Sequence, residues 1–132
     1  MAITIEWDSN EQTSLLCEYR DKWTWEEFFA AGQKSTDMKN QVNHKVDLIL
    51  DMSETTIPNG VALKFRKIAN LKTPNTGILV LVTNSDMVRM LFNLFTNIYS
   101  PAAKKYQIVN SIDKARFLIL EARSKRETTG QK

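Results

Sequence analysis

The sequence predicts an α/β fold: a mixed, mostly parallel five-stranded sheet with an N-terminal β-hairpin and four helices. Two observations predict it. Segments of strand periodicity alternate with segments of helical periodicity in the order β-β-α-β-α-β-α-β-α. Strands that alternate with helices in this way form parallel, right-handed crossovers. A length of 132 residues suits one domain, which we assign to residues 1–127, followed by a frayed tail at 128–132.

The N-terminal third predicts a hairpin and a helix. The segment ITIEWDS, which begins at Ile3, alternates apolar and polar residues as a half-buried strand does, and TSLLCEYR returns after a turn. Thr24 and Glu27 have the spacing of a capping box, in which each side chain accepts a hydrogen bond from the other residue's amide. A helix is therefore expected to begin here and to run to about Gln41.

Two strands with apolar residues on both sides follow. They are VDLILDMS, which begins at Val46, and GILVLVTN, which covers Gly77–Asn84. Both patterns are typical of parallel strands inside a sheet whose two faces are covered. Between them, Gly60–Lys72 is expected to be helical, with Asn59 as its cap and Pro58 fixing the preceding turn.

The last third predicts two helices around an edge strand. Ser85 is expected to cap a long helix that reaches about Tyr99, where the Ser100-Pro101 pair stops it. The segment YQIVNS is short enough for an edge strand. Ser111 then caps a final helix over Ile112–Arg126.

The composition excludes several classes of protein. The lone Cys17 excludes an internal disulfide, and with His44 as the single histidine no Cys- or His-based catalytic set or metal site can be assembled. We therefore expect no enzyme, no metal and no cofactor. No signal peptide or bilayer-spanning apolar run is visible, which favours a cytoplasmic protein without a membrane span. The basic residues of the second half are scattered, which is typical of solvated faces rather than of a nucleic-acid site.

Four segments, WTWEEFFAA, VDLILDMSETTIPNG, GILVLVTNSDMVRMLF and NSIDKARFLIL, resemble the STAS family, in particular its branch of sporulation anti-sigma-factor-antagonist-like proteins. The resemblance covers nearly the whole chain and implies the same α/β fold. It also implies that the loop after the middle strand is a docking surface for a protein partner. Classical members carry an Asp-Ser-Ser-Gly-like segment there, in which a partner kinase phosphorylates a serine. This chain has Ile57-Pro58-Asn59-Gly60 instead, so the phosphorylation switch is not carried over.

Polar residues follow the two buried strands. Ligands of open α/β sheets bind beyond the carboxyl ends of the strands, so these residues form the candidate partner or ligand site. They are Asp51, Ser53, Glu54, Thr55, Thr56, Pro58, Asn59, Gly60, Asn84, Ser85 and Asp86. Two interpretations stay open: the residues serve only as helix caps and turns, or they also bind.

The predicted helix over residues 86–99 is too apolar for an ordinary surface helix. Projected at 100° per residue, its apolar arc covers roughly 200°, whereas a surface helix needs about 100°. Either neighbouring elements cover the excess, or it forms an interface with another protein or with a second copy in a homodimer. The candidate interface residues are Val88, Met90, Phe92 and Tyr99.

We therefore expect a non-enzymatic regulatory or scaffold module that acts by protein–protein interaction through the polar loop and this helix. The alternative is a sensor or carrier, in which the excess apolar surface lines a pocket for a small apolar ligand or a lipid.

Overall fold

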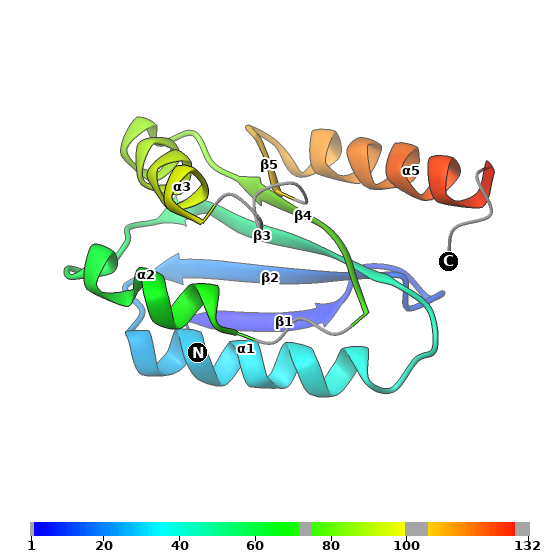
Figure 1. Ribbon diagram of the computed structural model, residues 1–132, viewed down its shortest axis with the longest axis horizontal. Coiled ribbons are helices and arrows are strands. Elements are labelled where there is room, and N and C mark those ends of the chain that lie inside the picture. The colour runs from blue at the N-terminus through cyan, green and yellow to red at the C-terminus, as the bar shows by residue number, and fades with distance from the viewer. Residues whose placement is uncertain (1, 72–74, 100–105, 129–132) are drawn as a thin grey trace.

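The computed structural model describes residues 2–71, 75–99 and 106–128 of the chain (Figure 1). The elements are β1 (Ile3–Trp7), β2 (Ser14–Asp21), α1 (Trp25–Lys39), β3 (Val46–Thr55), α2 (Val61–Ala69), β4 (Thr76–Val82), α3 (Asp86–Ile98), β5 (Tyr106–Val109) and α5 (Ile112–Thr128). This order confirms the predicted α/β fold. No helix in the described part of the chain is both long and apolar enough to cross a membrane.

The five strands lie side by side in the order of the sequence. β1 and β2 are antiparallel, with Ile5 opposite Cys17, and every other pair of neighbours is parallel. In the β3–β4 pair, Asp51 lies opposite Val82. The carboxyl ends of these two strands therefore meet at one edge of the sheet, as the sequence predicted.

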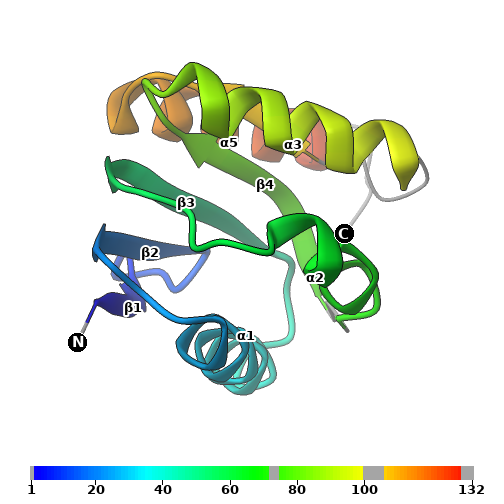
Figure 2. The ribbon, with the colours of Figure 1, turned by 90° about the vertical axis from the view of Figure 1, so that its left-hand side faces the viewer.

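Alternate side chains of β2, β3, β4 and β5 enter two separate cores, whereas β1 contributes to one of them. On one face, Cys17 and Leu48 pack with residues of α1 and α3. α2 belongs to the same face, because its Phe65 makes an edge-to-face contact with Phe95 of α3 at 5.3 Å between ring centroids. The other core contains Leu16, Ile49, Val80, Val82 and the α5 residues Ala115 and Ile119. The sheet thus carries three helices on one face and α5 alone on the other (Figure 2).

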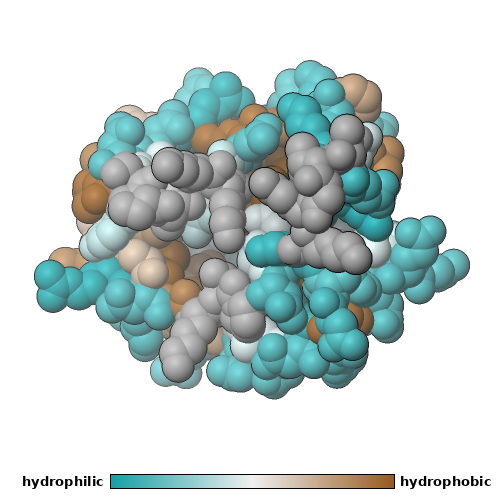
Figure 3. All heavy atoms as spheres, turned by 45° about the vertical axis from the view of Figure 1, so that its right-hand side comes forward, coloured by the Kyte–Doolittle hydropathy of each residue, from teal (hydrophilic) through white to brown (hydrophobic). Residues whose placement is uncertain are grey.

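The face under α5 is covered only in part. The α5 backbone lies closest to β3, β4 and β5, so Ile49 and Val80 are fully buried. On the hairpin this cover ends: Thr4, Glu6 and Arg20 are exposed, although Leu16 of β2 still packs in the α5 core. The expectation of two covered faces for β3 and β4 is therefore confirmed, and β1 is half-buried as expected. Figure 3 shows one side of the molecule, where hydrophilic side chains cover most of the surface and hydrophobic ones form patches between them.

Three of the four predicted helix caps are present. Thr24 and Glu27 form the capping box of α1, Ser85 accepts a hydrogen bond from the Val88 amide at 3.2 Å, and Ser111 accepts one from the Lys114 amide at 3.2 Å. The prediction for Asn59 was wrong. Gly60 is the N-cap of α2 and has a left-handed backbone with φ of 82°, a conformation that favours glycine.

Some predicted boundaries differ from the observed ones. α1 ends at Lys39 and α2 at Ala69, each a few residues earlier than expected. Lys72 and the predicted stop at Ser100-Pro101 lie outside the described residues. Of the predicted tail, Thr128 is the last residue of α5, and residues 129–132 also lie outside the described part.

Candidate functional site

The first group of predicted rim residues belongs to a strand rather than to a loop. β3 continues to Thr55 because it pairs with β2 beyond the end of β4. Asp51, Ser53, Glu54 and Thr55 are therefore strand residues, which corrects the prediction. The buried Asp51 carboxylate accepts hydrogen bonds from the Ser53 amide at 3.1 Å and from its hydroxyl at 2.6 Å. Glu54 forms an ion pair with Arg20.

The remaining rim residues surround the starts of α2 and α3. Thr56, Asn59, Asn84 and Asp86 are exposed. The Asn59 carbonyl accepts a hydrogen bond from the Trp25 indole N–H at 3.1 Å, which ties the loop to the first turn of α1. The two groups meet at one edge of the sheet, and most of their described hydrogen bonds serve the strand end, the loop and the caps. Binding by this edge stays a prediction.

The apolar surface of α3 is rotated relative to the predicted interface. Val88 is only 5% exposed and belongs to the core, so its assignment to an interface was wrong. Phe92 stacks on Tyr106 at 5.4 Å, and Tyr99 packs on Phe95 at 5.2 Å. Of the predicted set, only Met90 is well exposed, at 61%. The exposed apolar stripe of α3 consists of Met87, Met90, Leu94 and Ile98.

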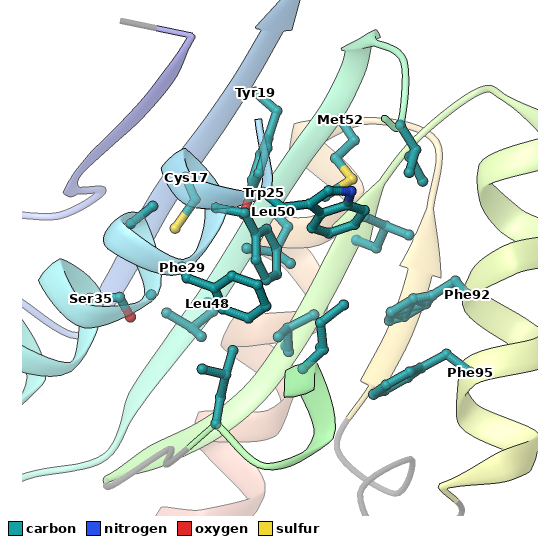
Figure 4. Close-up of a pocket in the computed structure, with 18 of the residues that line it drawn as sticks. Cys17, Tyr19, Trp25, Phe29, Ser35, Leu48, Leu50, Met52, Phe92 and Phe95 are labelled. Atoms are coloured by element: carbon teal, nitrogen blue, oxygen red, sulfur yellow. The ribbon is translucent and has the colours of Figure 1, made fainter. Parts of the chain in front are cut away.

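A cavity of about 550 Å³ lies between the sheet and the layer of α1, α2 and α3. Its lining is largely apolar, and it falls within the range of roughly 300–1,000 Å³ typical of small-molecule sites. In Figure 4, Trp25 and Phe29 reach in from α1, Phe92 and Phe95 approach from α3, and β3 lies between them. The β3 floor consists of Leu48, Leu50 and Met52.

The difference between the two helical layers explains the cavity. On the α5 side, the small Ala115 packs directly on the sheet and is fully buried. On the other side, large aromatic rings of α1 and α3 border the space, and contacts such as Phe28 on Phe29 at 5.2 Å keep the α1 wall in place. Gly32 of α1 adds no side chain to the space. The nearest heavy atom to a Cβ built on it is Leu71 Cδ1, at 3.9 Å.

The cavity has few polar groups, and most of them are neutral. Burial raises the pKa of the Cys17 thiol to about 12, against a smaller opposite effect of Lys39. Burial also raises the pKa of Tyr19 well above its ordinary value. The buried indole N–H of Trp23 has no hydrogen-bond partner among the described residues, which leaves a donor for a ligand acceptor. No metal-binding group of His, Cys, Asp or Glu occurs in the described part of the chain.

Sequence reasoning missed the polar end of this cavity. Ser35 and Lys39 are buried on α1 and line the cavity. The sequence does indicate them. One face of the helix carries Phe28, Gly32, Ser35 and Lys39, which are spaced by three or four residues. A lysine in that register is expected to face the core together with the phenylalanine.

The fold and the cavity define the class of this protein: an α/β domain with a mixed five-stranded sheet and an apolar cavity beneath its three-helix face. Comparison with family models, curated proteins and solved structures found no match to the chain. The resemblance to the STAS family therefore remains an expectation from the sequence.

Proposed function

We propose that this protein is a non-enzymatic binding module that takes a small apolar ligand into the cavity between the sheet and α1–α3. The observation that supports the proposal is the cavity itself, about 550 Å³ in volume and lined by aromatic and aliphatic side chains. Burial of apolar ligand surface in the cavity stabilises the complex by about 25 cal/mol per Å².

A contact between the cavity and the rim loop supports a sensor rather than a simple carrier. Trp25 lines the cavity, and its indole N–H donates to the Asn59 carbonyl in the predicted docking loop. A ligand that moves the Trp25 ring changes the position of this loop. Occupancy of the cavity then alters the surface that a regulatory partner contacts.

Filling the cavity from Gly32 tests the proposal. The uncharged fluorescent probe N-phenyl-1-naphthylamine is expected to bind the native protein, and Gly32→Phe is expected to weaken its binding at least tenfold, about 1.4 kcal/mol. Gly32→Ala is the matched control. It adds only a methyl group at ordinary contact distance from Leu71 Cδ1, so it leaves probe affinity unchanged and raises the free energy of unfolding by about 0.5–1 kcal/mol through helix propensity. Equal affinity in the phenylalanine and alanine variants would place the probe elsewhere and contradict the proposal.

The exposed stripe of α3 supports a second candidate function, protein–protein interaction by a regulatory or scaffold module. Met87, Met90, Leu94 and Ile98 are all exposed, and their spacing places them on one side of the helix. Contiguous exposed apolar surface marks interaction sites in soluble proteins. A second copy of the chain is the simplest partner, because a self-complementary patch gives a twofold dimer.

Light scattering coupled to size exclusion tests this second candidate. The native protein is expected to dimerise at high concentration, and Leu94→Glu is expected to produce monomers, because a buried unpaired carboxylate is costly. The neighbouring exposed Asn93 gives the control, Asn93→Glu, which adds the same charge beside the stripe and leaves the dimer intact. A native protein that stays monomeric at every concentration rules out the dimer.

A further inference from the structure

Lys39 supplies the single cationic side chain among the described residues that line the cavity. It is the last residue of α1, and only 1% of it is exposed. Its Nζ donates a hydrogen bond to Thr76 Oγ1 at 2.9 Å. None of the ion pairs between described residues includes Lys39. The residues outside the described part carry no Asp or Glu side chain that could pair with it.

A buried ammonium without a counter-charge is unfavourable. An ammonium has three N–H donors, and the Thr76 hydroxyl satisfies one of them. The transfer of such a charge out of water is strongly unfavourable unless an opposite charge compensates it. Cys17 lies close enough to interact with Lys39 but is a neutral thiol at pH 7. Burial accordingly lowers the pKa of Lys39.

The anchoring atoms sit at one end of the cavity. Thr76 opens β4 and lies opposite Val46, the first residue of β3. The apolar floor continues along β3 as far as Met52. Four residue steps from Leu48 to Met52, at about 3.3 Å each, make this floor about 13 Å long. The cavity therefore has an apolar floor along β3 and one buried cation near the end of that floor.

We infer that the ligand is a long-chain monocarboxylate, whose carboxylate pairs with Lys39 Nζ and whose hydrocarbon chain lies along β3 toward Met52. The inference rests on the proposed function, because it specifies the ligand of the same cavity. A carboxylate matches the site better than a phosphate monoester does. One cation balances one negative charge, whereas a phosphate monoester carries about −1.5 to −2 and would bury an uncompensated remainder.

The experiment compares three ligands of equal chain length: dodecanoate, 1-dodecanol and dodecyl phosphate. Binding to the native protein is followed at pH 7 by the fluorescence of Trp23 and Trp25, which line the cavity. Dodecanoate is expected to bind about 10–100-fold more tightly than dodecanol, as for one charge-assisted hydrogen bond. Dodecyl phosphate is expected to bind more weakly than dodecanoate.

Two variants test whether the charge of Lys39 causes the difference in affinity between dodecanoate and dodecanol. Lys39→Met keeps most of the length of the side chain and removes its charge. It is expected to weaken the binding of dodecanoate at least tenfold while leaving the affinity for dodecanol within about threefold of the native value. The control, Lys34→Met, removes a charge from an exposed position of the same helix and changes neither affinity.

The outcomes separate this inference from the proposed function. If dodecanol binds the native protein as tightly as dodecanoate, the cavity function stands and the carboxylate assignment fails, whether or not Lys39→Met folds. The assignment also fails if Lys39→Met lowers the affinities for dodecanoate and dodecanol equally. It fails likewise if the native protein binds dodecyl phosphate more tightly than dodecanoate. If none of the three ligands binds, the proposed function itself fails.

Discussion

Replacement of Asp47 by alanine is expected to lower the free energy of unfolding by about 3–5 kcal/mol, the typical effect of removing one partner of a buried ion pair. Asp47 is fully buried at the start of β3. Its Oδ1 accepts the Ile78 amide at 2.8 Å, and its two oxygens accept Arg126 Nη1 and Nη2 at 3.2 and 3.0 Å. One carboxylate thus joins β3, β4 and the end of α5.

Urea unfolding followed by circular dichroism measures this loss, and the chain contains its own control. Arg116 of α5 makes a similar bidentate ion pair with Asp8, at 2.8 and 3.0 Å, but this pair is more open to solvent: the Arg116 side chain is 49% exposed and that of Asp8 10%, against 20% and 0% for Arg126 and Asp47. Asp8→Ala is therefore expected to cost about 1 kcal/mol or less. Equal losses in Asp8→Ala and Asp47→Ala would show that burial of the Asp47 pair has no special role.

Gly77→Ala is expected to cost at least about 3 kcal/mol, because the added methyl group breaks the same buried network. A Cβ on Gly77 would lie 2.0 Å from Asp47 Oδ1 and 2.8 Å from Arg126 Nη1. Both distances are too short for real contacts, so the carboxylate must leave its position and lose its hydrogen bonds. Gly77 is in an apolar strand, where glycine is otherwise unfavourable.

A double-mutant cycle tests this explanation. In the Asp47→Ala background the main obstacle is absent, and the methyl group added at position 77 meets only the flexible end of Arg126. Gly77→Ala is then expected to cost less than about 1 kcal/mol, which gives a coupling energy of about 2 kcal/mol. Additive losses in the double variant would contradict a clash with Asp47 as the cause.

The fold could be predicted because its signals are local. The alternating hairpin, the capping box at Thr24 and the branched apolar run of β4 each indicate one element, and the alternation of strands with helices indicates parallel crossovers. The end of β3 could not be predicted in this way. Its last residues are polar, and they remain in the strand because β2 supplies hydrogen-bond partners beyond the end of β4.

The candidate site was harder to predict because it depends on side-chain volumes from distant segments. An apolar arc of α3 that covers more than half of the helix does not reveal which edge faces the sheet. The structure turns Val88 and Phe95 inward and leaves Met90 and Leu94 in solvent. Lys39 and Thr76 are 37 residues apart, and only the packing of α1 across the sheet brings them into contact.

The central claim is that the cavity, and not the exposed stripe of α3, takes an apolar ligand. Methyl NMR spectra of protein labelled at Leu and Met, recorded with and without dodecanoate, test it directly. We expect shifts of the Leu48, Leu50 and Met52 methyl signals, which line the cavity, and none of Met87, Met90 or Leu94, which lie in solvent. Shifts confined to the α3 methyl groups, with those of β3 unmoved, would contradict the account.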